Sequence, residues 1–513
     1  MEKSARFYYF LSASAMLVFL VGMAFFFNFT AEDAYITYRY SENLVNFHEL
    51  VFNQGEAINA LTSPMHGILS AALFLLFRNT VLTNKILSLF MLLGSAFLLW
   101  RRYKDYPEYR SAAIILILAS PHILLWTFGG LETVILLFLV TLVIVLADTV
   151  PSASLEPKWL YAIFILAGFG FLTRFDSILF FAPFLSWAAV RSRSIKHVFF
   201  AGLLGALIPV AWLLFSQNYY GDIFPSSFYV KPPTLDNPSV FIRNRKYIAY
   251  NLIYTGIVPM LLFFLLFPVK PFKKISSVAR HFASTWGLYL GVLLELSYGL
   301  SMATKHMMFS FRYFVPYLPA VVILILDLLV RLPTQEQKSF NHKGIFSVFA
   351  KAFLLALLAF QTYQIHYSYN VSVNGLSHVG EYSNLSVKSY IEFMKILKNE
   401  AFDIQHHWES TANFQGRQPR IYTYAEGILP YTYRNSFVFG KLVSNKPRIG
   451  KDQKYLLASD YIQILTPRNG TIEEQLPDPA IGYIPVSSYT MVFDGAEEQF
   501  LVFYNPTPQL NFP

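Results

Sequence analysis

The chain has 513 residues, of which 55% are hydrophobic and only 14% charged, with a formal net charge of +9 and no cysteine. Its mean hydropathy of +0.42 excludes an ordinary soluble globular domain and indicates an integral membrane protein. The lack of cysteine excludes disulfides and thiolate metal sites. In a membrane protein, excess positive charge is first a sign of topology, so no nucleic-acid partner is expected.

The first apolar run covers residues 7–28 and is long enough to cross a bilayer core of about 30 Å. Lys3 and Arg6 precede it, as basic residues do in a signal peptide. The run is longer than the apolar core of a signal peptide, however, and many similar runs follow it. We therefore expect a retained first span whose N-terminus lies in the cytoplasm.

Basic residues cluster between the later apolar runs, at 101–110, 191–196, 270–280 and 331–343. If each cluster marks a cytoplasmic loop, the positive-inside rule gives about 11 crossings. The run at 66–78 is short for a full crossing and is expected to be interfacial or partly inserted, because counting it as a span would place the 101–110 loop outside. The expected spans are 7–28, 82–100, 111–127, 132–149, 159–173, 177–190, 197–215, 250–268, 283–300, 314–330 and 345–362.

This topology places the tail and several loops on the extracytoplasmic face. The predicted architecture is a polytopic α-helical membrane module, residues 1–362 with outer loops 29–65 and 216–249, followed by an extracytoplasmic α/β domain, residues 363–513. In the tail, apolar residues at helical spacing after Ser383-Asn384 predict a helix over 385–399. The segments RIYTYA, KYLLASDYIQIL and QFLVFYNP are typical of strands.

Charged residues gather on the predicted outer face. Glu32 and Asp33 follow the first span, Glu132 lies in GGLET, and Arg174 and Asp176 interrupt apolar sequence. Ionisable residues at membrane depth usually face an internal cavity or a partner, although the acidic pair alone fits solvated residues at a helix end equally well. A carboxylate that deprotonates a hydroxyl, with cations that hold a phosphate, predicts chemistry at a phosphate leaving group. The cations and histidines of this face are Arg39, Arg174, Lys231, Lys305, Arg312, His66 and His306.

The segment AEDAYITYRYSENLVNFHELVFNQGEAINALTSPMHG, residues 31–67, resembles the first outer loop of membrane glycosyltransferases of the GT-C superfamily. It is most similar to the bacterial arabinofuranosyltransferase-like branch, in which an acidic-Asp-Ala-Tyr/Phe-Ile-Thr-x-Arg-Tyr motif opens the loop and Thr-Ser/Asn-Pro closes it. Further matches follow in order: GGLET at 129–133, LTR at 172–174, NYYGDIFPSSFYVK at 218–231 and RYFVPYLP at 312–319. Each match is weak alone, whereas the ordered set is specific.

The resemblance implies an inverting enzyme that moves a hexosyl or pentosyl group from a polyprenyl-phosphate donor to a hydroxyl acceptor, such as a glycan. It would work on the outer face of the bacterial inner membrane, in cell-envelope assembly. The resemblance maps the general base onto Asp33, with Glu32 as its neighbour. The expected ligands of the donor phosphate are Lys231, Arg312, Arg174, His66 and Lys305, and the expected substrate contacts are Tyr35, Glu132, Tyr219, Tyr220 and Phe228.

Structural roles are alternatives for most of these cations. Lys231 beside two prolines fits an ordinary loop lysine, Arg312 fits a side chain that snorkels to the interface, and Arg174 fits a structural pair with Asp176. His66 fits a cap of the short helix equally well. For Arg39, pairing with one of the acidic residues Glu32 and Glu42 is favoured over substrate contact.

The sequence departs from the family pattern at two places. Many relatives carry Asp-Asp where this chain has Glu32-Asp33, which leaves Asp33 as the safer base. LTRFDS stands in place of Leu-Thr-Arg-Pro-Glu-Gly, so the role of Asp176 stays open. Asp33 with Glu132 would offer oxygen ligands to a divalent cation, as in related oligosaccharyltransferases. A basic phosphate clamp makes a metal unnecessary, so catalysis without a metal or other cofactor is expected.

Two other classes of function fit a chain with many spans. A secondary transporter or lipid flippase would place its site near the bilayer midplane between internal repeats. The sequence has no such repeat, and its candidate groups lie in the outer loops, which argues against transport. A non-enzymatic scaffold whose outer domain binds partners is the third alternative.

Overall fold

The structure is a computed structural model, and the residues it describes fall into two compact units. The described residues are 2–148, 155–192, 194–230, 249, 252–266, 271–302, 309–331, 342–371, 386–411, 417–423, 426–439, 459–465, 482–493, 496–506 and 508. One unit, called the helical unit, comprises Met1–Phe29, Lys85–Ala211 and Pro233–Val387. The other, called the mixed unit, comprises Thr30–Asn84, Trp212–Pro232 and Lys388–Pro513.

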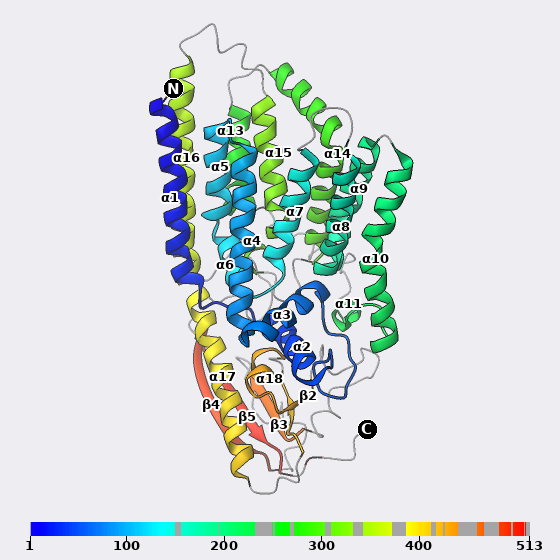
Figure 1. The fold of residues 1–513 in the computed structure, drawn as a ribbon. Coiled ribbons are helices and arrows are strands. Elements are labelled where there is room, and N and C mark those ends of the chain that lie inside the picture. Colours follow the sequence, from blue (N-terminus) through cyan, green and yellow to red (C-terminus); the bar gives the residue numbers. More distant parts are fainter. Residues whose placement is uncertain are drawn as a thin grey trace. The chain divides into compact units, whose positions relative to one another are not determined.

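The helical unit is built from long apolar helices that lie side by side (Figure 1). In it α1 packs against α5, α6 and α16, α7 against α8 and α15, and α9 against α14. Each predicted span overlaps at least one helix. Their bounds are α1 Glu2–Phe26, α4 Thr80–Arg102, α5 Pro107–Leu118, α6 Pro121–Phe128, α7 Thr133–Asp148, α8 Pro157–Thr173, α9 Ile178–Arg191, α10 Ile195–Tyr220, α13 Ile257–Leu266, α14 Pro271–Met302, α15 Leu318–Arg331 and α16 His342–Asn370, with 3-10 turns η1 Phe175–Ser177, η2 Phe309–Phe311 and η3 Val315–Tyr317.

The fold class predicted from the sequence, a polytopic helical chain with a small α/β part, is confirmed. Among the described residues, four helices are long and apolar enough to cross a membrane alone: Ala5–Phe26, Thr80–Arg102, Ile195–Tyr220 and Val348–Asn370. The other apolar helices are shorter or bent. The count of about 11 crossings therefore stays a prediction, as do the sidedness of the loops and the division at residue 362.

One predicted span is not a single continuous helix. The expected span 111–127 is broken into α5 and α6, which are bent by 48°. The cause is Pro121, which begins α6 and forces Ser120 before it into an extended conformation with φ −68° and ψ 119°.

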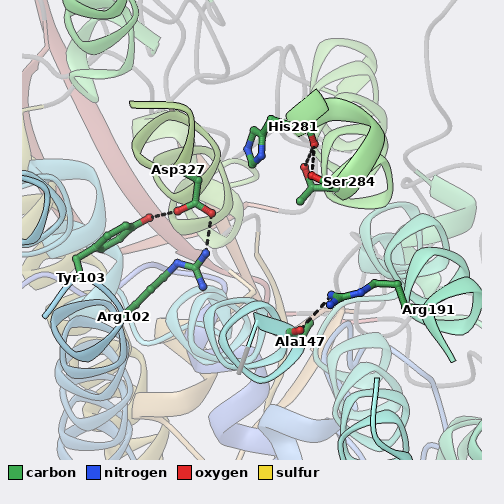
Figure 2. Close-up of polar contacts among 8 residues, drawn as sticks. Arg102, Tyr103, Ala147, Arg191, His281, Ser284 and Asp327 are labelled. Carbon is green, nitrogen blue, oxygen red and sulfur yellow. Dashed lines mark hydrogen bonds and ion pairs between the residues drawn. The ribbon is translucent and has the colours of Figure 1, made fainter. Parts of the chain in front are cut away.

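A second bend lies in α14 at Thr285, whose φ of −136° and ψ of 26° are not helical. The hydroxyls of Ser284 and Thr285 both donate to the carbonyl oxygen of His281, at 2.9 and 2.6 Å, and such local bonds bend helices (Figure 2 shows the Ser284 contact). Beyond the bend, Gly287 and Gly291 let α9 approach closely: a Cβ at either would come within 3 Å of a carbonyl oxygen of α9.

Two residues of the predicted basic clusters tie helices of this unit together (Figure 2). Arg102 at the end of α4 binds Asp327 of α15 at 2.6 Å, and Tyr103 donates to the same carboxylate at 2.9 Å. Arg191 at the end of α9 donates to the carbonyl oxygen of Ala147 in the last turn of α7, at 3.1 Å. These cations thus have structural partners in addition to their use as markers of topology.

The mixed unit contains a five-stranded sheet in the order β2-β1-β3-β5-β4. Strand β1 (Arg420–Tyr422) is parallel to β2 (Phe437–Phe439) and β3 (Tyr461–Leu465), whereas β5 (Ala496–Tyr504) is antiparallel to β3 and β4 (Ile484–Phe493). Helix α17 (Val387–Ser410) lies along the sheet (Figure 1), and its Ala401, Ile404 and Trp408 form one core cluster with Ile421 and Tyr461.

The helix and the strands predicted for the tail are present, but the tail contains two further strands. Three predicted strands overlap β1, β3 and β5, and the predicted helix 385–399 overlaps the first part of the longer α17. Strands β2 and β4 were not predicted. β2 has only three residues, and β4 carries Ser487-Ser488 and a register shift after Pro485 that interrupt its alternation.

The described part of the mixed unit also has four short helices: α2 Ala34–Phe47, α3 Pro64–Phe77, α11 Ser226–Val230 and α18 Ile428–Thr432. α3 is the short apolar run that was expected to be interfacial, and it packs against α2. α2 also packs against α18 of the tail, so residues far apart in sequence share this unit.

Candidate active site

Asp33, the predicted base, is the N-cap residue of α2. Its side chain makes no capping hydrogen bond, while its backbone oxygen accepts from the N–H of Ile36 at 3.2 Å. The residue is half-buried, between Glu32 and Ala34, which are both buried. The Asp33 carboxylate is therefore not used to cap the helix, and part of the residue is accessible.

Glu32, the predicted neighbour of the base, is enclosed by the tail. Its Oε1 accepts hydrogen bonds from the backbone N–H groups of Gly427 and Ile428, the latter at 3.1 Å, and its own N–H donates to the Tyr390 hydroxyl at 2.9 Å. Burial, and next the charge of Asp33, raise the pKa of Glu32 to about 8. Glu32 is thus a packing and hydrogen-bonding residue at the start of α18, and only Asp33 of the pair is partly accessible.

Tyrosines surround the first turn of α2. The ring of Tyr35 contacts the rings of Tyr38 and Tyr431, with centroids 5.7 and 5.1 Å apart. Tyr35 is half-buried, and burial raises the pKa of its hydroxyl to about 12, so it is a hydrogen-bond donor at neutral pH. Tyr35, predicted as a substrate contact, therefore lies two residues from Asp33 in an aromatic cluster to which the tail contributes.

Arg39 does not pair with Glu32 or Glu42, and the expectation of an acidic partner is wrong. Its guanidinium donates to the carbonyl oxygens of Phe52 at 2.8 Å, Pro430 at 2.5 Å and Ser436 at 2.6 Å. Burial lowers the pKa of Arg39 to about 9, which still leaves a cation at neutral pH. The planar fork of arginine suits three backbone acceptors, so the side chain fixes α2 to the tail.

His66 is a buried residue of α3. Only 1% of it is exposed, and its Nε2 lies 2.9 Å from Oδ1 of Asn84, which also accepts from Ser70 at 2.8 Å. Ser63, not His66, is the N-cap residue of α3. The structure therefore gives His66 a structural contact, and a role at a phosphate stays a prediction that these contacts do not favour.

The predicted aromatic contacts of the second outer loop divide into two kinds. Tyr220 is 4% exposed, and its hydroxyl donates to the carbonyl oxygen of Leu50 at 2.7 Å, which makes it a structural residue. Tyr219 is 36% exposed and Phe228 is 59% exposed, stacked on Phe215 and Phe224 respectively. These two exposed aromatic faces are the better candidates for contact with a sugar or a prenyl chain.

The helical unit holds a buried charged cluster. Arg174, in the turn between α8 and α9, binds Asp176 through Nε at 3.0 Å and through a terminal nitrogen at 2.5 Å, and it binds Glu132 at 3.2 Å. Arg312 lies 3.7 Å from the same oxygen of Glu132. The structure thus brings together three residues predicted from separate motifs, and the pairing of Arg174 with Asp176 is observed.

Aromatic rings support both arginines of this cluster. The Arg174 guanidinium lies 4.4 Å from the Tyr313 ring centroid, and that of Arg312 lies 5.6 Å from the Trp126 ring centroid. Trp126 in turn donates through Nε1 to the carbonyl oxygen of Ser310 at 2.9 Å. The cations are therefore held by carboxylates on one side and by aromatic faces on another.

Sequence reasoning missed several residues of these sites. Glu295 of α14 is 2% exposed and lies close enough to Asp176 and Arg174 to interact electrostatically. An acidic residue inside an apolar run is a signal that would have found it. Tyr390 lies in the tail, and nothing local marks it as a partner of Glu32.

Two predicted ligands of the donor phosphate, Lys231 and Lys305, lie outside the described residues. Among the residues that the structure does describe, no group of three or more acidic or histidine side chains is arranged to hold a metal ion. Catalysis without a metal stays a prediction, since the arrangement of the described residues does not test it.

The chain matches no family model and no curated protein. Its structure is similar to that of ArnT from Cupriavidus metallidurans in the apo state, with a TM-score of 0.59 and 14% identity over 98% of each chain. It is also similar to the same protein bound to undecaprenyl phosphate, with a TM-score of 0.56 and 15% identity over 98% of each chain. The similarity extends over 98% of each chain, so this protein shares the fold of ArnT.

Proposed function

We propose that this chain, which has the GT-C fold, is an inverting glycosyltransferase. It transfers a sugar from a polyprenyl-phosphate donor to a hydroxyl acceptor on the outer face of the cytoplasmic membrane, in the assembly of a cell-envelope glycan. The observation that carries the proposal is the fold, shared over 98% of both chains with ArnT, a protein whose structure bound to undecaprenyl phosphate is known.

We assign the general base to Asp33. Deprotonation of an acceptor hydroxyl needs a carboxylate that a substrate can reach. Asp33 is half-buried and does not cap its helix, whereas the adjacent Glu32 is enclosed and hydrogen-bonded to two backbone N–H groups. The activated hydroxyl then attacks the anomeric carbon from the face opposite the phosphate, the sugar–phosphate bond breaks, and the configuration inverts.

We assign the stabilisation of the leaving phosphate to the buried arginines. Negative charge grows on the phosphate as its bond to the sugar breaks, so a cation there stabilises the transition state more than the ground state. Arg312 is the first candidate, because Arg174 is already engaged on two sides by Asp176, at 3.0 and 2.5 Å. Lys231 and Lys305 stay candidates from the sequence.

The prenyl chain of the donor is proposed to bind in an apolar groove of about 400 Å³ between α9 and α14. Ala182, Pro183, Trp286, Leu290 and Leu294 line it. One end of the groove reaches Ile178, which follows the turn that carries Asp176, and Leu294 directly precedes Glu295. A chain in this groove would therefore end beside the charged cluster that is proposed to hold its phosphate.

The test of the function is a transfer assay. Purified protein in nanodiscs is given a radiolabelled polyprenyl-phosphate sugar, and release of polyprenyl phosphate is followed with and without candidate glycan acceptors. Slow release that accelerates with acceptor is expected. No release from any pentosyl or hexosyl donor would refute the proposal, and movement of intact donor between leaflets would favour a flippase instead.

A further inference from the structure

We propose that the tail segment 427–438, called the brace, is a working part of the glycosyltransferase site, and that Glu32 is the residue through which it positions Asp33. The proposal rests on the function proposed above. It gives the tail a defined role, which is to fix the loop that carries the base, in addition to any contact with acceptor.

The brace is tied at both ends to the first outer loop. At its start, the N–H groups of Gly427 and Ile428 donate to Oε1 of Glu32. At its end, Val438 exchanges two bonds with Asn53, whose amide donates at 2.9 Å and accepts at 3.1 Å. Asn53 is 1% exposed, so water cannot reach its amide, and breaking these bonds would leave buried polar groups without partners.

Between its ends, the brace contacts two charged side chains of α2. Arg39 donates to the carbonyl oxygens of Pro430 and Ser436, at 2.5 and 2.6 Å. Glu42, 3% exposed, accepts from the Tyr431 hydroxyl at 2.7 Å and forms an ion pair with Arg434 at 2.7 Å. A buried charge that loses its partners is strongly unfavourable, so these contacts set where α2 can lie.

Glu32 directly precedes the base, and the tail holds it by both backbone and side chain. Its N–H donates to Tyr390 of α17 and its carboxyl accepts from the brace. The fit is close: a Cβ at Gly427 would collide with the Glu32 backbone oxygen and carboxyl. The backbone of residue 32 therefore has little conformational freedom. Because Asp33 follows directly, the position of Glu32 sets the direction in which the Asp33 side chain points.

The contacts of Glu32 separate a positioning role from a chemical one. One oxygen, Oε1, accepts the hydrogen bonds of both Gly427 and Ile428. A glutamine amide oxygen can accept both of them, whereas alanine offers no acceptor. Glu32→Gln should therefore preserve the brace, and Glu32→Ala should release it. A general base or nucleophile at this position would be lost in both variants.

The experiment compares the parent with Glu32→Gln and Glu32→Ala, as full-length proteins in nanodiscs with the same radiolabelled polyprenyl-phosphate sugar. We expect Glu32→Gln to keep kcat within about 3-fold of the parent and Glu32→Ala to lose about 10- to 100-fold in kcat, with the donor KM changed less than about 3-fold. A Glu32→Gln protein as inactive as Asp33→Asn, or a Glu32→Ala protein with parental kcat, would overturn the proposal.

A second measurement does not depend on activity. Hydrogen exchange of the Gly427 and Ile428 amides should accelerate at least about 10-fold in Glu32→Ala and stay parental in Glu32→Gln. Equal exchange in all three proteins refutes the brace even if no donor is turned over, whereas protected amides in an inactive parent refute only the glycosyl transfer. If Glu32→Ala fails to fold, Tyr390→Phe is used instead, because it removes only the hydroxyl that binds the Glu32 N–H. A several-fold loss of kcat in this variant supports the proposal, and parental kcat refutes it.

Discussion

The buried Glu32 predicts a specific pH dependence of stability. Its pKa is raised from 4.5 to about 8 in the folded chain by burial, by Asp33 and, less, by Glu426, against the lowering effect of the Gly427 and Ile428 N–H groups. Between these two pH values the folded chain keeps a proton that the unfolded chain has released. The contribution of protonated Glu32 to the free energy of unfolding is therefore fully present below about pH 4.5, is lost as the pH rises, and is gone above about pH 8.

The size of the effect follows from that displacement. Each pH unit between the two pKa values is worth about 1.4 kcal/mol, so the span from 4.5 to about 8 amounts to at most about 5 kcal/mol of unfolding free energy. Glu32→Gln cannot ionise and keeps the acceptor oxygen. The variant should therefore gain stability over the parent progressively as the pH rises through this window.

The assay is thermal unfolding in detergent at pH 5, 6, 7 and 8, at one scan rate, for the parent and Glu32→Gln. The difference between the two midpoints isolates Glu32 from other buried acids, such as Glu400, whose pKa is also raised to about 8 by burial. Glu392→Gln, at an exposed acid of α17, is the matched control and should follow the parent. A midpoint difference that is the same at pH 5 and pH 8 would refute the reasoning.

Four further predictions follow from the proposed site. Asp33→Asn should lower kcat by at least about 10³-fold with the donor KM nearly unchanged, and turnover near the parental rate would remove Asp33 as base. Arg312→Ala should cost about 10²- to 10³-fold in kcat/KM, and more than Arg174→Lys, which keeps a charge beside Asp176; the reverse order would transfer the clamp to Arg174. Ala182→Trp should raise KM for a long-chain donor but not for a short-chain analogue, and equal effects on both would place the prenyl chain elsewhere. Exhaustive chelation should leave turnover unchanged, and loss of activity restored by a divalent cation would show a metal requirement.

The fold was predictable because its signals are local. Apolar runs of membrane length, separated by basic clusters, mark helices wherever they lie, and each predicted span overlaps at least one helix in the structure. Even the break between α5 and α6 has a local cause, Pro121, that a stricter reading of the sequence would have found. Strands β2 and β4 escaped because a three-residue strand and an irregular one carry little alternation.

The candidate site was predictable only in part. The ordered set of sequence motifs predicted Glu132, Arg174 and Arg312 as site residues, and the structure brings these three together. The partner of Arg39 was harder to predict: the expected partner is an acidic residue, whereas the side chain binds three carbonyl oxygens. Backbone acceptors are present at every residue, so no side-chain pattern in the sequence reveals which of them a buried arginine will use.

The sequence by itself determined that this protein belongs in a membrane, where its helices lie along the chain, and that an acidic pair follows its first apolar run, since hydropathy and charge are properties of short segments. Only the tertiary structure decided which residue of the pair is buried. Glu32 is buried and accepts hydrogen bonds from backbone N–H groups nearly 400 residues later in the chain, at Gly427 and Ile428, whereas Asp33 is half-buried. Burial depends on neighbours in space, so the sequence alone could not distinguish two adjacent acids of the same chemistry.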